Sequence, residues 1–366
     1  MTAETITGQT GSTVPVVSVI IPARNEEASL GACLDSLVAR TRVNLENVSF
    51  EIIMVDDNST DRTREIAASF PNVRVIDAAP LPSGWTGKNN AVATGARQAR
   101  GLWLLFTDAD TVHVLGSLAR ALSEAQQHGA ELLSYSPEQI AVTFWEIATL
   151  PVVFAELARQ YPPSKVSDPR SPVAAANGQY ILVRRDTYDA VGGHAAVAGD
   201  ILEDVALARA VKSTGRKIRF RYAADAVRTR MYRNYAQLRE GWTKNLALLF
   251  PKPGWLATQT VLFWAFPFAN LLLPLFVPAV VHRAWWFVPG GLVFARNTGR
   301  MRRANFDLTM EIMGALFGMP MFAYLLLRSK RAHANGNVAW KGRTYSDKPS
   351  TDKPASEKAA VLATGH

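Results

Sequence analysis

Short apolar segments alternate with helical patterns along the first part of the chain. The apolar segments span residues 16–21, 51–55, 73–76 and 102–106, and the clearest helical pattern spans residues 88–99. Short, fully apolar strands that alternate with helices are typical of a parallel sheet covered on both faces. The sequence therefore predicts an α/β fold, with a mostly parallel sheet and helices on both faces, over residues 15–250. Residues 1–14 are expected to form a flexible N-terminus.

The pattern changes after the first 250 residues, where long apolar segments begin. Residues 255–281 contain no charged side chain, and this length exceeds the roughly 20 residues that a membrane-crossing helix needs. Two further apolar segments, 285–295 and 308–327, are followed by arginine clusters, as at the cytoplasmic ends of membrane helices. We therefore expect a transmembrane region of two or three segments over residues 251–330. A polar, partly disordered tail is expected over residues 331–366.

The charge of the chain changes sign near its middle. The sequence of 366 residues has 40 basic and 31 acidic side chains, a net charge of +9. Residues 1–208 carry 24 acidic and 15 basic side chains, whereas residues 209–348 carry 5 and 23. A basic, apolar half indicates contact with a membrane surface, whose anionic lipid headgroups attract basic side chains. Nucleic acid is not expected as a partner, because the basic residues lie beside the apolar segments.

The N-terminus bears on the cellular location of the acidic half. The first 14 residues contain neither a basic n-region nor an apolar h-region, so no signal peptide is expected. We therefore expect an integral protein of the cell (inner) membrane whose acidic domain is cytoplasmic. A disulfide scaffold is excluded, because Cys33 is the single cysteine of the sequence.

One segment of the acidic domain is unusually apolar. Residues 139–158 hold only two charged side chains, Glu146 and Glu156. This pattern predicts an amphipathic segment over residues 139–160 that lies in the membrane interface and presents a lipid to the domain. Burial in the core of the protein is the alternative interpretation.

Carboxylates follow two of the predicted strands directly. Asp57 comes after the segment at 51–55, and Asp108 and Asp110 come after the segment at 102–106. Ligands of such sheets bind beyond the carboxyl ends of the strands. Two carboxylates there can hold Mg²⁺ or Mn²⁺ while phosphate oxygens of a substrate complete the coordination shell. A dinucleotide site is not expected, because the turn after residues 16–21 lacks the glycines that it requires.

Several motifs in order resemble a known family. SVIIPARNEE, IIMVDDNSTD and LLFTDAD are followed by the Gly-Gly-His of residues 192–194 and the Ile-Leu-Glu-Asp of residues 201–204. Over residues 16–250 the chain resembles the family 2 glycosyltransferases, which have the inverting GT-A fold. GWTGK at residues 84–88 and WKGRTY at residues 340–345 are similar to membrane-bound lipid glycosyltransferases of the hopanoid-associated, carotenoid and ceramide-glucosyltransferase type.

The resemblance implies a donor site for a nucleotide sugar. Pro22, Asn25 and Glu26 would line the pocket for the base and ribose, and Asp57 would accept a hydrogen bond from the pyrimidine ring. Lys88, at the start of a predicted helix, would neutralise phosphate, which helix N-termini also favour.

The resemblance also assigns the metal, the base and the acceptor side. Asp108 and Asp110 would hold the metal on the diphosphate, with Asp110 as the direct ligand. Asp204 would be the general base, with Glu203 beside it in the catalytic pair. Trp242 would form the floor of the acceptor site and Lys244 would reach the diphosphate. An interfacial membrane anchor is the alternative for Trp242.

The resulting hypothesis is an inverting, metal-dependent transfer of a sugar to a lipid. The donor would be a nucleotide sugar, a UDP-hexose, and the acceptor a lipid hydroxyl at the cytoplasmic membrane face. A processive polysaccharide synthase is a first alternative, but the Gln-x-x-Arg-Trp motif of such enzymes is broken in residues 237–242. A non-catalytic membrane scaffold with a degenerate transferase domain is a second alternative. The presence of all the expected aspartates argues against it.

Overall fold

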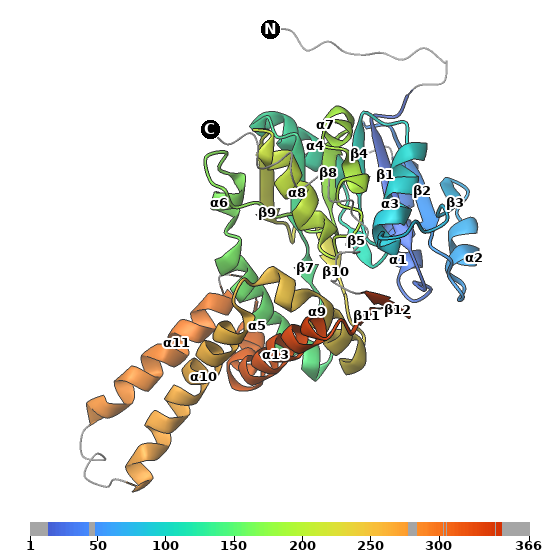
Figure 1. The fold of residues 1–366 in the computed structure, drawn as a ribbon. Coiled ribbons are helices and arrows are strands. Elements are labelled where there is room, and N and C mark those ends of the chain that lie inside the picture. Colours follow the sequence, from blue (N-terminus) through green and yellow to red (C-terminus); the bar gives the residue numbers. More distant parts are fainter. Residues whose placement is uncertain are drawn as a thin grey trace, which may run out of the picture.

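An α/β domain rests on a layer of helices, from which two helices project (Figure 1). The computed structural model describes residues 14–43, 48–276, 284–302, 304, 306–340 and 342–345. The flexible N-terminus expected over residues 1–14 lies outside the described residues except for Val14, and so does the part of the expected tail after Tyr345.

The α/β domain is built on a seven-stranded sheet. Its strands lie in the order β3 (Val73–Asp77), β2 (Phe50–Asp56), β1 (Val17–Ala23), β4 (Trp103–Phe106), β8 (Ile181–Arg184), β6 (Leu132–Ser136) and β9 (Ile218–Tyr222). Neighbouring strands are parallel except at β8, which is antiparallel to β4 and β6. The predicted mostly parallel sheet is confirmed. The reversal of β8 was not predicted, because its apolar sequence carries no signal of strand direction.

Helices cover both faces of this sheet, as predicted. One face is covered by α1 (Leu30–Val43), α2 (Thr63–Ala68) and α4 (Ser117–His128). The other is covered by α3 (Gly87–Gln98), α6 (Pro163–Ser167), α7 (Arg185–Ala190) and α8 (Glu203–Ser213). Strand β1 serves both cores, because successive side chains of a strand point to opposite faces. Val19 and Ile21 lie in the first core and Ile20 in the second.

Shorter elements complete the domain at the carboxyl edge of the sheet. A three-stranded sheet contains β5 (Thr111–His113), β10 (Val227–Thr229) and β7 (Glu138–Gln139). A 3₁₀ turn, η1 (Gly193–Ala195), packs against α3 and α8. The small sheet holds the segment after β4 in place, because β5 begins directly after Asp110.

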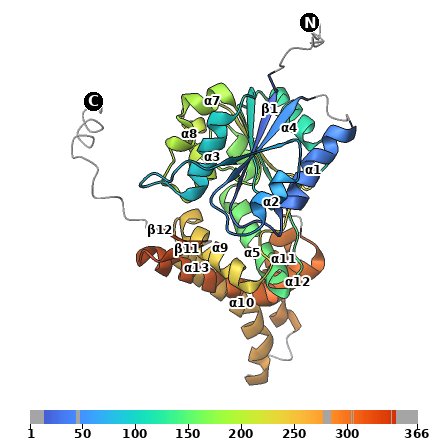
Figure 2. The ribbon, with the colours of Figure 1, turned by 90° about the vertical axis from the view of Figure 1, so that its right-hand side faces the viewer.

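The helical layer has its own apolar core. Its elements are α5 (Phe144–Gln160), α9 (Tyr235–Leu249), α10 (Pro253–Phe276), η3 (Ala284–Phe287), α11 (Val288–Arg302), α12 (Leu308–Met313), a π-helical turn η4 (Gly314–Gly318) and α13 (Met319–Ala334). A hairpin of β11 (Val338–Trp340) and β12 (Arg343–Tyr345) follows. Figure 2 shows this layer below the sheet, with α10 extending away from the domain.

Helix α5 is a core element of this layer. Thr143 and Glu146 form a capping box at its start, and its side chains from Ala148 to Glu156 are buried. Burial of these side chains favours the alternative interpretation, packing in the core, for the middle of the segment, and the interfacial position stays a prediction. Only its start exposes large apolar side chains, Ile140, Val142, Phe144 and Trp145.

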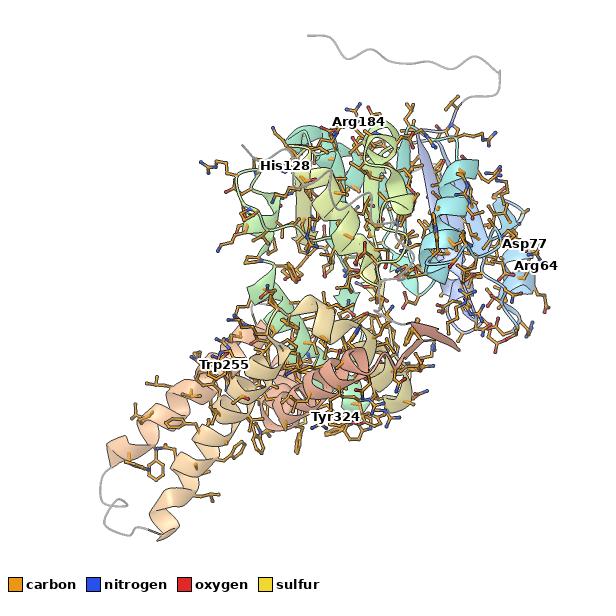
Figure 3. The ribbon with its side chains drawn as sticks, viewed as in Figure 1. Arg64, Asp77, His128, Arg184, Trp255 and Tyr324 are labelled. Atoms are coloured by element: carbon orange, nitrogen blue, oxygen red, sulfur yellow. The ribbon has the colours of Figure 1, made fainter. Side chains whose placement is uncertain are left out.

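The helical layer includes the predicted membrane segments. Among the described residues, one helical segment, Leu308–Ala334, is long and apolar enough to cross a membrane, and half of its most apolar window is buried inside the protein. Helix α10 covers the predicted segment at 255–281 as far as Phe276, and the rest lies outside the described residues. Trp255 and Tyr324 are exposed aromatic side chains of this layer (Figure 3). Two or three crossings stay a prediction.

A glycine sets the distance between α5 and η4. A Cβ atom at Gly318 would overlap the backbone carbonyl oxygen of Ala148 and would lie 2.9 Å from Val152 Cγ2. Because a backbone atom cannot rotate away, Gly318→Ala is expected to lower the free energy of unfolding by about 1–3 kcal/mol. The melting temperature of the purified protein in detergent measures this change.

Gly299 in α11 provides the matched control. A Cβ atom there meets nothing within 4 Å, so Gly299→Ala should raise stability by up to about 1 kcal/mol through helix propensity. Equal melting temperatures for the two variants would show that α5 and η4 are not in close contact.

Candidate active site

One cavity of about 300 Å³ lies between the carboxyl edge of the sheet and the helical layer. Its lining includes ten of the eleven residues that the sequence predicted: Pro22, Glu26, Asp57, Lys88, Asp108, Asp110, Glu203, Asp204, Trp242 and Lys244. These residues come from strand ends, from the starts of α3 and α8, and from α9. The fold therefore brings together side chains that are up to 222 positions apart in the sequence.

Lys88 is the electrostatic centre of the cavity. The Thr86 hydroxyl caps the N-terminus of α3 by accepting a hydrogen bond from Asn89 N at 3.1 Å, and this cap fixes the turn that carries Lys88. Lys88 Nζ lies 2.8 Å from Asp108 Oδ1 and 2.8 Å from Glu203 Oε1. Burial alone would lower the pKa of Lys88, but the two carboxylates raise it well above its usual value. Lys88 is therefore a permanent cation that joins β4 to α8.

Glu203 and Asp204 are adjacent in sequence, but their pKa values are shifted in opposite directions. Burial would raise the pKa of Glu203, but the ammonium groups of Lys88 and Lys244 lower it below its usual value. Burial, and then the Glu203 carboxylate, raise the pKa of Asp204 to about 6. Asp204 is therefore the carboxylate of the pair that can take up a proton near neutral pH, as a general base must.

Two backbone amides orient Asp204. Its Oδ2 accepts a hydrogen bond from Gly178 N at 2.9 Å, and its Oδ1 accepts one from Val205 N at 2.8 Å. A Cβ atom at Gly178 would lie 3.1 Å from Lys88 Nζ and 3.3 Å from Glu203 Oε1, so a larger residue there would push these two side chains by a few tenths of an ångström. Nothing in the local sequence distinguishes Gly178 from other glycines, so its contact with Asp204 was not predicted.

Asp57 is already paired with a side chain from the C-terminal hairpin. The guanidinium group of Arg343, on β12, donates two hydrogen bonds to the Asp57 carboxylate, and Arg343 Nη2 lies 3.0 Å from Asp57 Oδ1. A ligand that uses the Asp57 carboxylate must therefore share it with Arg343 or displace that side chain. The motif at residues 340–345 resembles lipid glycosyltransferases in sequence, but the sequence predicted no role for Arg343.

Asn25 is the predicted residue that the described structure does not place on the cavity wall. It adopts a left-handed backbone conformation with φ of 52°. Its Oδ1 accepts a hydrogen bond from Thr60 N at 2.9 Å. Asn25 thus joins the loop after β1 to the loop after β2, which carries Asp57, so its position is that of a supporting residue.

Helix α9 places Trp242 and Lys244 on the wall of the cavity. Trp242 is 3% exposed and packs edge-on against Tyr232 and Phe154, so the interpretation as an interfacial anchor is wrong. Burial, and then the charge of Lys88, lower the pKa of Lys244 against the effect of the carboxylates. Lys244 Nζ also lies 5.5 Å from the ring centre of Trp340 on β11. The hairpin therefore contacts the site at two points.

Asp108 and Asp110 offer oxygen ligands that suit a hard divalent cation. Both line the cavity, and the Asp110 backbone is held by a hydrogen bond from Thr229 Oγ1 to its carbonyl oxygen at 3.2 Å. Within the described ranges no group of three or more His, Cys, Asp or Glu side chains is arranged to hold a metal. Two carboxylates fit Mg²⁺ or Mn²⁺ where substrate oxygens supply the remaining ligands.

One part of the cavity is apolar. It is lined by Phe154 and Leu157 of α5, Leu249 of α9 and Phe220 of β9. Tyr161 closes it by donating a hydrogen bond to the carbonyl oxygen of Leu249 at 2.9 Å. Burial, and the charge of the nearby Asp204, raise the pKa of Tyr161. Asp204 therefore lies near both the charged cluster of Lys88 and Glu203 and Tyr161, which adjoins the apolar part of the same cavity.

Comparison with known proteins gives two kinds of similarity in sequence. Residues 18–191 match the family model described as glycosyl transferase family 2. A 4,4'-diaponeurosporenoate glycosyltransferase of Staphylococcus aureus strain MRSA252 is 29% identical over 342 residues, which cover 90% of this chain and 88% of that protein. The protein of the same name from strain USA300 is 27% identical over 339 residues.

Solved structures show a more distant similarity. The mannosyltransferase PcManGT from Pyrobaculum calidifontis, in complex with GDP-Man and Mn2+, is 17% identical, with a TM-score of 0.49 over 88% of this chain and 87% of that one. S. aureus TarS 1-349 in complex with UDP-GlcNAc is 13% identical, with a TM-score of 0.42 over 86% and 92%. Because both scores lie below 0.5, the sequence match is what identifies the domain. Over residues 18–191 the sequence of this chain is that of a domain similar to glycosyl transferase family 2.

Proposed function

We propose that this protein transfers a hexose from a UDP-sugar to a hydroxyl group of a lipid, with inversion, at the cytoplasmic face of the membrane. The observation that carries this proposal is that one cavity holds Asp204 together with a cluster of charged side chains and a set of apolar side chains. A donor with a diphosphate suits the charged part, and an acceptor with a hydrocarbon chain suits the apolar part.

The charged part has the groups that a nucleotide sugar requires. Asp57 is an acceptor for the imide N–H of a pyrimidine base, which would share the carboxylate with Arg343 or displace that side chain. Lys88 and Lys244 offer positive charge to the diphosphate as it departs. Asp108 and Asp110 would hold Mg²⁺ or Mn²⁺, which when bound neutralises charge on the diphosphate oxygens.

Asp204 acts on the acceptor. A hydroxyl group is a weak nucleophile, so a carboxylate within hydrogen-bond reach takes its proton as its oxygen attacks the anomeric carbon. The bond from that carbon to the diphosphate breaks on the opposite side. A single displacement of this kind inverts the configuration at the anomeric carbon. Glu203 assists indirectly, because its negative charge raises the pKa of Asp204.

The acceptor class rests on the apolar part of the cavity and on the relatives. Phe154, Leu157 and Leu249 provide a surface for a hydrocarbon chain beside the base. The similar Staphylococcus aureus proteins are named for action on 4,4'-diaponeurosporenoate. We infer that a carotenoid-type lipid is the acceptor class, which extended apolar helices such as α10 would keep close to the protein.

The direct test uses full-length protein purified in detergent with Mn²⁺, a UDP-hexose and a lipid extract. Mass spectrometry should detect a lipid whose mass increases by one hexose. Release of UDP without any glycosylated lipid would contradict the proposed acceptor class, and addition of many sugars would indicate a polymerising enzyme.

Asp204→Asn is expected to lower kcat by about 10²–10⁴-fold, which is the usual contribution of a general base. Binding of UDP, measured by calorimetry, should change little, because the amide keeps the shape of the side chain. Asp200→Asn is the matched control, since Asp200 lies four positions earlier and outside the lining of the cavity. Wild-type activity in Asp204→Asn would remove Asp204 from its proposed role.

The pH dependence of transfer should follow Asp204. Its pKa is raised to about 6, so the carboxylate becomes protonated, and cannot act as a base, as the pH falls through that value. The value of kcat/KM is therefore expected to decrease about tenfold per pH unit below about pH 6 and to level off above it. The residual activity of Asp204→Asn should not show this decrease below about pH 6. The same decrease in that variant would show that another group titrates there.

Removal of divalent ions with EDTA is expected to abolish transfer, and Mn²⁺ or Mg²⁺ should restore it. Asp110→Asn should raise the metal concentration for half-maximal activity by at least about tenfold, the lower end of what loss of an outer-shell partner costs. Asp77→Asn is the control, because Asp77 ends the edge strand β3 of the same sheet but pairs with Arg64 on the surface, away from the cavity (Figure 3). Full activity in EDTA would refute the metal site.

A further inference from the structure

A second cavity, of about 230 Å³, lies inside the helical layer. Its walls come from α5, α10, α11 and α13. Helix α5 separates it from the active-site cavity, because Phe154 and Leu157 face the active site whereas Ala155 and Arg159 face the second cavity. Residues at this spacing lie on different faces of a helix. The transfer reaction proposed above makes no use of this second cavity.

The lining of the second cavity has a surplus of positive charge. Arg159, Arg296 and Arg300 contribute three guanidinium groups, and Glu156 is the one carboxylate among the lining residues. Arg159 Nε lies 2.7 Å and Arg300 Nη1 lies 3.4 Å from oxygens of Glu156. The Arg296 guanidinium carbon lies 4.1 Å from the ring centre of Phe263. Guanidinium groups suit phosphate, because their planar N–H donors match its oxygens.

Asn297 supplies a second, independent feature of the cavity. It is 4% exposed, and its Nδ2 donates to the carbonyl oxygen of Phe263 at 3.3 Å. Among the described residues, none donates a hydrogen bond to its buried Oδ1. A buried acceptor without a donor destabilises the structure, because the acceptor has lost its hydrogen bonds to water. A ligand with a hydroxyl group would remove that cost.

Exposed apolar side chains lie next to this cavity. Val261, Leu262 and Phe266 are exposed on α10, and Val288 and Leu292 are exposed on α11. These two helices form the pair that projects from the helical layer (Figure 1). Exposed apolar surface of this kind marks contact with a membrane or a partner. A molecule with a charged head in the cavity can therefore lay hydrocarbon chains along the projecting helices.

We propose that the second cavity binds the headgroup of an anionic phospholipid whose headgroup carries a hydroxyl, such as phosphatidylglycerol. The phosphate lies on Arg296 and Arg300, and the hydroxyl donates a hydrogen bond to Asn297 Oδ1. The lipid is a structural ligand of the helical layer and is distinct from the acceptor. Its binding does not depend on sugar transfer, so it can be measured without a donor.

The test is a titration of the full-length protein in neutral detergent with single lipids, read by native mass spectrometry. Phosphatidylglycerol should bind at least about tenfold more tightly than phosphatidylcholine, as charge-assisted hydrogen bonds predict. Phosphatidylmethanol, which is anionic but has no headgroup hydroxyl, should bind with an affinity between those of phosphatidylglycerol and phosphatidylcholine. Equal binding of all three lipids would overturn the proposal without the need for any variant.

Two variants and a control locate the site. Arg296→Gln should weaken binding of phosphatidylglycerol about tenfold, and Asn297→Leu should remove the preference for phosphatidylglycerol over phosphatidylmethanol. Lys330→Gln removes the same charge from the exposed surface of α13, outside the cavity lining, and should bind as the wild type does. An equal loss in Lys330→Gln would indicate unspecific attraction. Complete competition by inorganic phosphate would show an anion site that does not recognise lipid.

Discussion

The pairing of the Lys88 ammonium group with two carboxylates is the interaction on which the site depends. A charge in a partly enclosed cavity is stabilised when it is paired and hydrogen-bonded, and the half-buried Lys88 is paired with Asp108 and Glu203 at 2.8 Å each. These contacts fix the start of α3, the end of β4 and the start of α8 relative to one another. They also explain why Asp204 differs from its neighbour. Lys88 and Lys244 stabilise the charge on Glu203, and that charge in turn raises the pKa of Asp204.

The helical layer supplies the second wall of the active-site cavity. The strand ends supply carboxylates, but the other wall of the cavity comes from α5, α9 and the hairpin of β11 and β12. Helix α5 has two functional faces, one toward the active site and one toward the arginine-lined cavity. A single buried helix thus connects the chemistry of the α/β domain to the part of the chain that we expect to contact lipid. Its apolar sequence serves the packing of this helix between the two cavities.

The pairing of Arg343 with Asp57 gives the C-terminal hairpin a place in the site. Bidentate pairs of arginine and carboxylate are among the stronger hydrogen-bonded contacts in proteins. A donor base that uses Asp57 must share this carboxylate with Arg343 or displace the guanidinium group, so the position of β12 bears directly on donor binding. Trp340 beside Lys244 means that a movement of the hairpin would also change the surroundings of that ammonium group.

The sequence by itself determined the α/β alternation, the helices on both faces and ten of the cavity residues. These features are local, because Asp57, Asp108 and Asp110 directly follow apolar strands and Asp204 begins a helix. The tertiary structure alone decided the reversal of β8, the burial of α5, the role of Gly178 and the pairing of Arg343 with Asp57. Each of these depends on which distant segments meet. The pattern of a single segment records whether it is buried, but it does not record which neighbour buries it.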